Sequence, residues 1–578
     1  MQRIKILKKI VFVAFAIIVV RLFFVQIIEH DVWLEKAKKQ HTILETIVAR
    51  RGQIYMMDHN EPVAVVLNQA VYSIIIDPSI VELDTLKELL HKHADDYIVA
   101  DLDRVYSVEG LRYYVVARNV PRAVALEIAK TETAGIWFQK NNQRVYPEGE
   151  MASGLLGFVN MDGVGQYGVE GSLNSLLAGS DGLLKTVADV NSVALSIGDD
   201  NVKTPAKDGE DIVLSVDRGL EQGIEELALS ALNSTAATNA AVLVMDPRSG
   251  EVLAMGNLPN YDPSNYGYVN NASAYINYVT ESPYEPASTF KSFTYSAAIN
   301  EGVMTAETEY FNKHYEVIDG WTIWNASTNS FLYGPISMKR AFAWSLNSGS
   351  IYALKLLGGN PNQITKEGRE KLYDYYYNKF RFGQLTGIEI AEAKGYIEDP
   401  NEGWGRDSTY ANMTFGQNLG VTMIQAATAF SAVVNGGYYH TPTIVKGILK
   451  NQQITEFERE EEVINEQIIT SETSSAMREL LINNRSAQVR SGIDRAGYAI
   501  GGKTGTAQVV RNGAYDNTMS ELVGSYIGFL GPSDELPRFV VMVRMWGEGQ
   551  SIVSSDANNL FDLVASFIID YCKIKPAM

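Results

Sequence analysis

The amino-terminal residues combine a basic segment with a long apolar run. Four basic residues lie within positions 1–9, and an apolar stretch from 10 to 28 follows, interrupted only by Arg21 and Gln26. Because an α-helix rises about 1.5 Å per residue, this stretch nearly spans the core of a bilayer and can cross it once. No small-x-small cleavage site follows in residues 29–33, so the pattern predicts an uncleaved signal anchor rather than a removable signal peptide.

The basic flank predicts the orientation of this anchor. Since positively charged flanks stay inside, residues 1–9 are expected to form a cytoplasmic tail, with everything after about residue 30 outside the inner membrane. The predicted location is therefore the cell (inner) membrane, with a single crossing and an extracytoplasmic main body. A charge such as Arg21 is costly within the span, and two interpretations account for it equally well: the side chain snorkels, or it meets a partner helix.

Short alternating patterns follow the anchor. A charged stretch at 32–40 is expected to be helical, and the patterns at 51–55, 62–66 and 71–76 predict short strands separated by turns. No set of residues with evident chemistry accompanies them. We therefore expect residues 29–210 to form a mixed, strand-rich module without a catalytic role.

A glycine-rich segment in this module requires a separate explanation. Residues 163–168 match Gly-x-Gly-x-x-Gly, and Asp189 follows about twenty residues later, as in dinucleotide-binding folds. Against a nucleotide site stand the extracytoplasmic location, the preceding turn at Asp162, and the lack of alternating strands and helices around the glycines. A glycine-rich turn closed by Glu170 is the better interpretation.

A second region begins near Asp211. A strand pattern at 212–216 leads into a helical pattern at 220–232. Two strand patterns at 241–245 and 251–255 then flank an Asp-Pro-Arg-Ser-Gly turn. These two strands predict a hairpin that begins a sheet.

The carboxyl end supplies the continuation of that sheet. Strand patterns occur at 499–509, 523–530 and 539–546. A closing helix carries an apolar stripe at Leu560, Val564, Phe567, Ile568 and Tyr571. The first and last segments of 211–578 are therefore expected to share one sheet, with a mostly helical insertion between about 260 and 495. The predicted fold class is α+β.

The composition excludes several classes of function. With 49 basic and 68 acidic residues the formal charge is −19, which repels the phosphates of nucleic acids. Cys572 is the only cysteine, so the sequence predicts no disulfide framework, no cysteine metal cluster and no thiol nucleophile. The seven histidines lack the spacing of metal ligands, and we expect neither a metal nor a cofactor.

Candidate chemistry lies in three short motifs, of which Ser288 to Lys291 is the first. A serine that opens a helix, with a lysine three residues later, places its hydroxyl and the amine on one face, one turn apart. Ser288 is the candidate nucleophile, and Lys291 can act as its base only as a neutral amine. Burial or a nearby cation such as Lys503 could lower the lysine pKa; a shift from ~10.4 to ~7 corresponds to about 4–5 kcal/mol.

The second motif is Ser345-Leu346-Asn347, which we expect in a loop between helices. The serine offers a hydroxyl that relays protons, and the asparagine offers an amide that fixes the substrate or Lys291. The sequence leaves open which group deprotonates the nucleophile.

The third motif, Lys503 to Thr506, follows two glycines in a predicted strand. The glycines are expected to let a ligand backbone approach closely. Such a strand can bind a peptide by main-chain addition, while Lys503 and a threonine hydroxyl hold the terminal carboxylate of that peptide. The predicted substrate is thus an anionic peptide.

Together, the three motifs resemble those of the class B penicillin-binding proteins. The resemblance covers nearly the whole chain. Further matching positions are Arg51, Gly52, Arg144, Tyr146, Pro147, Gly149, Gly165, Gly168, Glu170, the stretch 246–255, and Glu285 to Lys291. Three positions depart from the family pattern: Ala287 and Asn418 replace a usual glycine, and Met423 replaces a usual proline. These residues neighbour the site, so they affect local loop shape more than the reacting groups.

The resemblance implies an architecture in three parts. A transmembrane signal anchor at 10–28 is followed by a pedestal at 29–210, which corresponds to the dimerisation-like domain of the family. A penicillin-binding transpeptidase domain at 211–578 follows, with a five-stranded antiparallel sheet flanked by helices and a helical insertion subdomain.

The resemblance also implies a reaction. Ser288 attacks the penultimate D-alanine carbonyl of a peptidoglycan stem peptide ending in D-Ala-D-Ala, and the acyl group passes to an amine on a neighbouring stem. β-Lactams acylate the same serine. The implied site consists of catalytic Ser288, Lys291, Ser345, Asn347 and Lys503, substrate-binding Thr504, Gly505 and Thr506, and an oxyanion hole formed by the N–H groups of Ser288 and Thr506.

Partners and subtype follow from the same resemblance. No glycosyltransferase module lies between anchor and catalytic domain, so the implied partner is a membrane-embedded glycosyltransferase that contacts the transmembrane helix and the pedestal. Residues 387–390 and 393–396 resemble the division (septal) type more than the elongation type.

Other functions use the same motifs. A D,D-carboxypeptidase or a serine β-lactamase transfers the acyl group to water, although the anchor and the pedestal argue against the β-lactamase. A non-catalytic β-lactam sensor or scaffold keeps the fold only to bind partners. Product analysis with and without an acceptor amine distinguishes a transpeptidase from the carboxypeptidase and the β-lactamase. A Ser288→Ala variant that retains cellular function would identify the sensor or scaffold.

Overall fold

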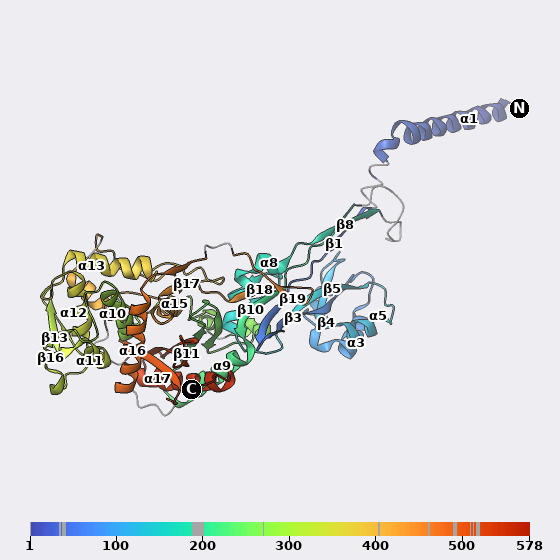
Figure 1. The fold of residues 1–578 in the computed structure, drawn as a ribbon. Coiled ribbons are helices and arrows are strands. Elements are labelled where there is room, and N and C mark those ends of the chain that lie inside the picture. The colour runs from blue at the N-terminus through green and yellow to red at the C-terminus, as the bar shows by residue number, and fades with distance from the viewer. Residues whose placement is uncertain are drawn as a thin grey trace. The chain divides into compact units, whose positions relative to one another are not determined.

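The computed structural model (Figure 1) describes residues 2–33, 36, 42–187, 202–269, 271–402, 405–459, 463–488, 494–508, 510–511, 514–515 and 521–578. Asp189, Val509 and most of the helix expected at 32–40 lie outside the described residues. The chain divides into two compact units, one made of Met1–Gly52 with Ala178–Glu210 and the other of Gln53–Leu177 with Asp211–Met578.

The first unit contains the amino-terminal helix. Helix α1 (Gln2–Phe23) continues into a π-helical turn, η1 (Phe24–Ile28), and by length and composition Arg3–Ile28 can cross a membrane. Arg21 Nη1 lies 4.0 Å from Glu29 Oε2, so the guanidinium is directed toward the carboxyl end of the helix. The unit also contains an antiparallel sheet of β1 (Thr42–Ile47), β8 (Gly182–Val187) and β9 (Val202–Thr204).

A seven-stranded sheet in the second unit joins distant parts of the sequence. Its order is β19-β18-β10-β2-β3-β4, with β5 also paired to β3, and only β10 and β2 run parallel. Strands from both sides of the boundary expected near Asp211 therefore share one sheet, and the domain limits stay a prediction. The strands are β2 (Ile54–Asp58), β3 (Glu61–Ile76), β4 (Tyr114–Pro121), β5 (Ile136–Val145), β10 (Ile212–Asp217), β18 (Val445–Lys450) and β19 (Gln453–Thr455).

Strand β3 shows that the expectation of two short strands at 62–66 and 71–76 was wrong. It is one strand of 16 residues. Its first part pairs with β2, and its second part pairs with β4 and β5. The linking residues 67–70 contain neither glycine nor proline and pair one by one with β5, so the strand changes partners without breaking.

Helices on this part of the unit enclose a small core against the second half of β3. Apolar residues such as Ile74, Leu86, Leu90, Val116 and Ile128 are fully or almost fully buried there. The helices are α3 (Leu83–His93), η2 (Asp95–Tyr97), α4 (Leu102–Tyr106) and α5 (Arg122–Ala129).

The glycine-rich segment contains the short strand β7 (Gly165–Gln166), which pairs antiparallel with β6 (Phe158–Val159), and it is not part of a dinucleotide-binding fold. Gly168 has φ +44°, and a Cβ there would lie 2.2 Å from the Leu155 carbonyl oxygen, so a larger residue does not fit. Helix α7 (Gly168–Ser172) carries Glu170, which accepts a 2.6 Å hydrogen bond from Arg144 Nε in a buried ion pair. The segments α6 (Ser153–Leu156) and α8 (Asn174–Ala178) flank the turn.

The five-stranded sheet of the second unit has the order β12-β11-β25-β24-β21 and is antiparallel throughout, as expected. Side chains alternate between its faces, so Val242 and Val244 contribute to one core while Leu243 and Met245 contribute to the other. Helices α9 and α17 pack on the first face, and helices of the insertion pack on the second. The elements are β11 (Asn239–Met245), β12 (Val252–Leu258), β21 (Tyr498–Gln508), β24 (Leu522–Pro532), β25 (Phe539–Trp546), α9 (Arg218–Ser234) and α17 (Ser554–Tyr571).

The insertion is mostly helical, as expected, but it also contains short paired strands that the sequence did not predict. Figure 1 shows β13 and β16 near α11 and α12. Its helices are η3 (Pro263–Tyr268), η4 (Ala272–Tyr275), η5 (Ala287–Phe290), α10 (Lys291–Asn300), η6 (Ser330–Leu332), α11 (Met338–Ala343), α12 (Asn347–Leu357), α13 (Lys366–Tyr373), η7 (Asp374–Lys379), α14 (Asp407–Met413), α15 (Met423–Val434) and α16 (Ser471–Gln488). Besides β18 and β19, which join the seven-stranded sheet, its strands are β13 (Glu309–Asn312), β14 (Tyr315–Ile318), β15 (Trp321–Trp324), β16 (Gly334–Ser337), β17 (Tyr438–His440) and β20 (Asn465–Gln467). Beyond the insertion, β22 (Val510–Arg511) pairs with β23 (Ala514–Tyr515).

Candidate active site

Ser288 lies in a short 3-10 helix, η5, that leads directly into α10. The preceding residue, Ala287, has φ +49°, a left-handed conformation that favours glycine, and its N–H donates to the Gly416 carbonyl at 3.0 Å. The Ser288 side chain is half-buried, and its hydroxyl forms no hydrogen bond with the described residues. It therefore remains accessible to a ligand.

Lys291 begins α10 one turn after Ser288 and is completely buried. Its Nζ donates to the Ser345 carbonyl at 2.5 Å and to Asn347 Oδ1 at 2.8 Å, and it lies within hydrogen-bonding distance of Ser345 Oγ at 3.2 Å. The first two motifs are thus joined by direct hydrogen bonds.

Ser345 lies in the loop between α11 and α12, as expected, and Asn347 is the first residue of α12. Ser345 has φ +54°, so the loop turns sharply at this residue. The Asn347 amide is oriented by a second contact, because its Nδ2 donates to the Trp324 carbonyl at 2.9 Å.

Lys503 lies on β21 at the edge of the five-stranded sheet and is also completely buried. Its Nζ donates to Ser345 Oγ at 2.8 Å and to the Thr504 carbonyl at 3.3 Å. The Ser345 hydroxyl therefore connects both lysines, and the three motifs converge at one place.

The rest of the third motif borders the same place. Thr504 and Thr506 are half-buried, and Thr506 Oγ1 accepts from the Ser554 N–H at 3.2 Å. A Cβ on Gly505 would lie 2.6 Å from the Pro286 carbonyl oxygen, so only glycine lets β21 approach η5 this closely.

The two glycines before Lys503 have a different role from the one expected. A Cβ on Gly501 would lie 2.6 Å from the Phe529 ring, and one on Gly502 would lie 2.5 Å from the Tyr526 ring. These positions accommodate side chains of the neighbouring strand β24, so the space left by the two glycines is filled by the protein itself rather than by a ligand backbone.

Burial controls the charge of both amines. The pKa of Lys291 is held well below its usual range, first by burial and second by the nearby Lys503. Burial lowers the pKa of Lys503 to about 7. Within the described part of the chain, the hydrogen-bond acceptors of both amines are uncharged oxygens. A neutral lysine at neutral pH therefore has a physical cause here.

Three residues that support this arrangement escaped the sequence analysis. Asn484 of α16 donates to the carbonyls of residues 342 and 343, at the end of α11, and α16 contacts α10, α11 and β21. The guanidinium of the buried Arg544 lies between the rings of Tyr284 and Trp546, at 4.2 and 4.4 Å from their centroids. Tyr284 directly precedes the segment with Ser288 in the sequence. Trp324 acts through its carbonyl. No sequence motif marks such contacts, because they involve backbone carbonyl oxygens or aromatic rings that are far apart in the sequence.

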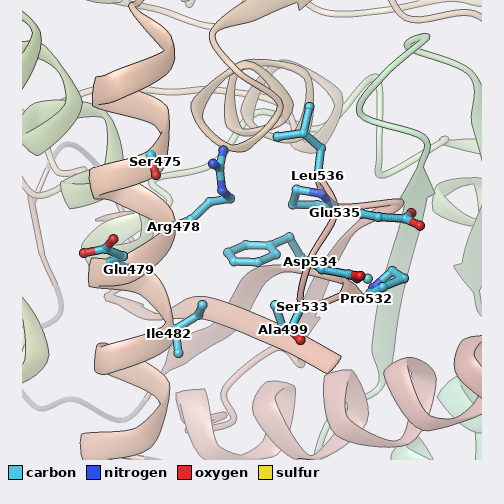
Figure 2. A pocket seen from close by; sticks show the side chains of 13 residues that line it. Ser475, Arg478, Glu479, Ile482, Ala499, Pro532, Ser533, Asp534, Glu535 and Leu536 are labelled. Atoms are coloured by element: carbon cyan, nitrogen blue, oxygen red, sulfur yellow. The ribbon is translucent and has the colours of Figure 1, made fainter. Parts of the chain in front are cut away.

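A separate cavity of about 410 Å³ lies between α16 and the connection from β24 to β25 (Figure 2). Arg478, Phe529 and Leu536 are among its lining residues, and none of the predicted site residues lines it. The presence of a sizeable cavity therefore does not by itself identify the place where the three motifs meet.

Comparison with protein families agrees with the motif geometry. The family model described as penicillin binding protein transpeptidase domain matches residues 240–562, more than half of the chain. The chain belongs to this penicillin-binding protein family. A second model, the penicillin-binding protein dimerisation domain, matches residues 46–214.

Relatives of this penicillin-binding protein extend over most of its length. Stage V sporulation protein D of Bacillus subtilis is 29% identical over 544 residues, which cover 92% of this chain and 80% of that protein. The probable peptidoglycan D,D-transpeptidase PenA of Neisseria meningitidis is 26% identical, covering 92% and 86%. The crystal structure of penicillin-binding protein 2X from Streptococcus thermophilus has a TM-score of 0.72 at 23% identity, covering 92% and 80%, and shows that the fold is shared.

Proposed function

We propose that this penicillin-binding protein is a peptidoglycan D,D-transpeptidase with Ser288 as its nucleophile. The observation that carries the proposal is the Ser345 hydroxyl, which lies 3.2 Å from the Lys291 amine and 2.8 Å from the Lys503 amine. Family membership and the name of the PenA relative support the reaction class.

The hydrogen bonds of Lys291 favour it as the base. The Ser345 carbonyl and Asn347 Oδ1 can only accept, and the two hydrogens of a neutral amine satisfy both. The lone pair of the amine is then available to a hydroxyl proton. A base positioned in this way typically contributes about 10²–10⁴ in rate.

In the first half-reaction the Ser288 proton moves to Lys291 as Oγ bonds to the penultimate D-alanine carbonyl carbon. The C–N bond to the terminal D-alanine then breaks. Its nitrogen takes a proton from Ser345, and Lys291 replaces that proton across their 3.2 Å contact. The products are an acyl ester on Ser288, free D-alanine and a neutral Lys291.

The second half-reaction repeats these steps in reverse order with another nucleophile. An amine of a neighbouring stem attacks the ester carbonyl and loses its proton through Ser345 to Lys291. The C–O bond breaks, and Ser288 recovers its proton from Lys291. The cross-link therefore forms without net consumption of protons at the site.

Two backbone N–H groups are proposed to stabilise the oxyanion, those of Ser288 and Thr506. The Ser288 N–H lies in the first turn of η5, where a helix provides no internal acceptor. Thr506 lies on β21 at the sheet edge, close to η5. Oxyanion donors are typically worth about 10²–10³ in rate.

The substrate carboxylate is proposed to lie against Lys503, Thr504 and Thr506, with Gly505 keeping the strand close to η5. A carboxylate that enters this buried region would stabilise the ammonium form of Lys503. β-Lactams carry a carboxylate beside a reactive carbonyl, so the same groups would direct them to acylate Ser288.

The cellular setting is part of the proposal. Residues 10–28 would anchor the chain in the inner membrane, residues 29–210 would form the pedestal, and residues 211–578 the extracytoplasmic transpeptidase domain. A membrane-embedded glycosyltransferase would contact the anchor and pedestal and supply glycan strands. The similarity of 387–390 and 393–396 to division-type enzymes supports a septal role.

The direct test combines a defined substrate with an acceptor. The full-length protein in detergent is incubated with a D-Ala-D-Ala stem peptide, with and without an amine acceptor, and products are separated by mass spectrometry. We expect D-alanine release and a cross-linked product, and neither with Ser288→Ala. Release without any cross-link at saturating acceptor would indicate a carboxypeptidase, and no release by the wild type would contradict the proposal.

A further inference from the structure

Large aromatic side chains are exposed next to the proposed catalytic groups. In the part of the insertion between α10 and α11, six aromatic residues are more than a third exposed, among them Trp321 at 69% and Trp324 at 58%. Two pairs of these rings are in contact, Phe311 with Tyr333 and Tyr315 with Trp324, and grouped apolar surface usually marks a binding site. The six residues are Phe311, Tyr315, Trp321, Trp324, Phe331 and Tyr333.

The hairpin of β14 and β15 gives this surface a defined shape. Tyr315 lies directly opposite Trp324 in the strand register, and their ring centroids are 5.0 Å apart. Val317 and Thr322 form the next pair on the same face, and both are exposed. On the other face Ile318 is buried in the core, and its partner Trp321 lies on that same face at the hairpin turn. One side of the hairpin thus anchors it while the other presents rings to solvent.

A direct contact connects this face to the proposed site. Asn347 donates through Nδ2 to the Trp324 carbonyl at 2.9 Å, and it accepts through Oδ1 from Lys291 at 2.8 Å. The base of the proposed reaction is therefore two hydrogen bonds away from the backbone of the hairpin. A substrate bound at Ser288 that extends past Asn347 would reach this hairpin.

The chemistry of the face favours a neutral, ring-shaped ligand with hydroxyl and amide groups. The carboxylate of Glu316 is occupied by Lys355 at 2.8 Å. The rings offer flat apolar surfaces, and Thr322, exposed on the same face, provides an uncharged hydrogen-bonding group. Pyranose rings have just such a character, with apolar C–H faces and a polar periphery.

We propose that the exposed face of the β14–β15 hairpin, with Tyr315 and Trp324 as its rings and Val317 beside them, binds the N-acetylhexosamine chain to which the stem peptide is attached. This proposal rests on the proposed function, because it assigns the glycan part of the same substrate. A stem peptide joins the reacting D-alanine to the glycan through a few residues of roughly 3.3 Å each, so both parts fit within one continuous surface.

The test compares substrates with and without sugar. Full-length wild type and a Tyr315→Ser/Val317→Ser variant, which leaves Trp324 in place, are given a D-Ala-D-Ala stem peptide, either free or attached to a disaccharide, and D-alanine release is measured. We expect the wild type to favour the disaccharide form about tenfold in kcat/KM, and the variant to lose this preference while it still processes the free peptide. Trp137→Ser, which removes an exposed tryptophan from β5, serves as the matched control and should keep the preference.

A binding measurement keeps the inference testable if the reaction itself is not observed. Saturation-transfer NMR with the β-1,4-linked N-acetylglucosamine tetramer should show contact with the wild type and with Trp137→Ser, but not with Tyr315→Ser/Val317→Ser. Absence of D-alanine release from either peptide contradicts the proposed function alone. Equal use of both substrates, or tetramer binding unchanged by the double substitution, overturns the glycan site and indicates that another partner uses these rings.

Discussion

The Lys503 amine lies 2.8 Å from the Ser345 hydroxyl. Both are held there by elements far apart in the sequence, an edge strand and a loop between helices. The contact places a second amine beside the hydroxyl that also touches Lys291. The charge state of one lysine therefore influences the other, and pH becomes an informative variable.

The pH dependence of the reaction should report both lysines. As pH falls, Lys291 gains a proton and can no longer act as the base, so kcat/KM for a D-Ala-D-Ala peptide decreases. As pH rises through about 7, Lys503 loses the charge that holds the carboxylate, so kcat/KM decreases again. The expected profile is bell-shaped in stopped-time assays of D-alanine release.

A change of substrate isolates the second limb of that profile. A peptide whose terminal carboxylate is amidated has no charge for Lys503 to bind. Its kcat/KM should be low but should lack the decrease above about pH 7. Identical alkaline limbs for both peptides would show that Lys503 does not recognise the carboxylate.

The burial of Lys503 should cost stability. Its pKa is about 7 in the folded protein and about 10.4 in the unfolded chain, so the unfolded state binds more protons between these values. The penalty is full below about pH 7, at about 4–5 kcal/mol, and disappears as pH rises toward 10.4. Lys503→Met should therefore raise the thermal midpoint at pH 6.5, with a gain that shrinks at pH 9.5.

The control for this measurement is Lys339→Met, which changes an exposed lysine. It should leave the midpoint nearly unchanged at both pH values. A Lys503→Met gain that stays constant with pH would mean that packing, rather than the buried charge, causes it.

Ala287 should carry backbone strain next to the nucleophile. An alanine at φ +49° costs about 1 kcal/mol relative to glycine. Glycine offsets part of this gain, because it raises the conformational entropy of the unfolded chain. Ala287→Gly should thus be neutral or slightly stabilising and should keep β-lactam acylation. Ala287→Val should destabilise by more than about 2 kcal/mol, since a β-branched side chain tolerates this conformation least. Thermal unfolding and acylation rates check both, and a stabilised valine variant would exclude the strain.

The Arg144–Glu170 ion pair should be essential for the stability of the region around the glycine-rich turn. Both side chains are almost completely buried, and Arg144 also donates to Asn68 at 2.8 Å. Arg144→Ala leaves a buried carboxylate without this partner and should lower the free energy of unfolding by about 3–5 kcal/mol.

The exposed pair of Lys130 and Glu127 provides the comparison for that loss. Lys130→Ala should cost less than about 1 kcal/mol, because solvent screens the charges. Denaturant unfolding of both variants gives the difference. Equal losses would contradict a special role for the buried pair.

Much of the catalytic core could be predicted from the sequence because its strands are buried. The alternation through 241–245 places apolar residues on both faces, and the three carboxyl-terminal strand patterns complete the same sheet. The order of the motifs also indicated which segments meet. Distances such as that between Ser345 and Lys503 depend on packing of whole elements, which no local pattern encodes.

Other features could not be predicted for identifiable reasons. Strand β3 continues through residues 67–70 because β5 supplies partners from more than sixty residues away. The hairpin of β14 and β15 has only four residues per strand, which is too few for a clear alternation of apolar and polar residues in the sequence. Gly501 and Gly502 suggested ligand access, but the rings that fill their space come from β24. In each case a distant segment determines the outcome.

The central claim is that Ser288 forms the acyl-enzyme with help from the lysines around Ser345. The most direct measurement is mass spectrometry of the full-length protein after brief exposure to a penicillin, followed by peptide mapping. The account predicts one penicilloyl adduct on the peptide that contains Ser288, absent from Ser288→Ala and formed much more slowly by Lys291→Met. An adduct of equal yield in Ser288→Ala, or one mapped to another residue, would contradict it.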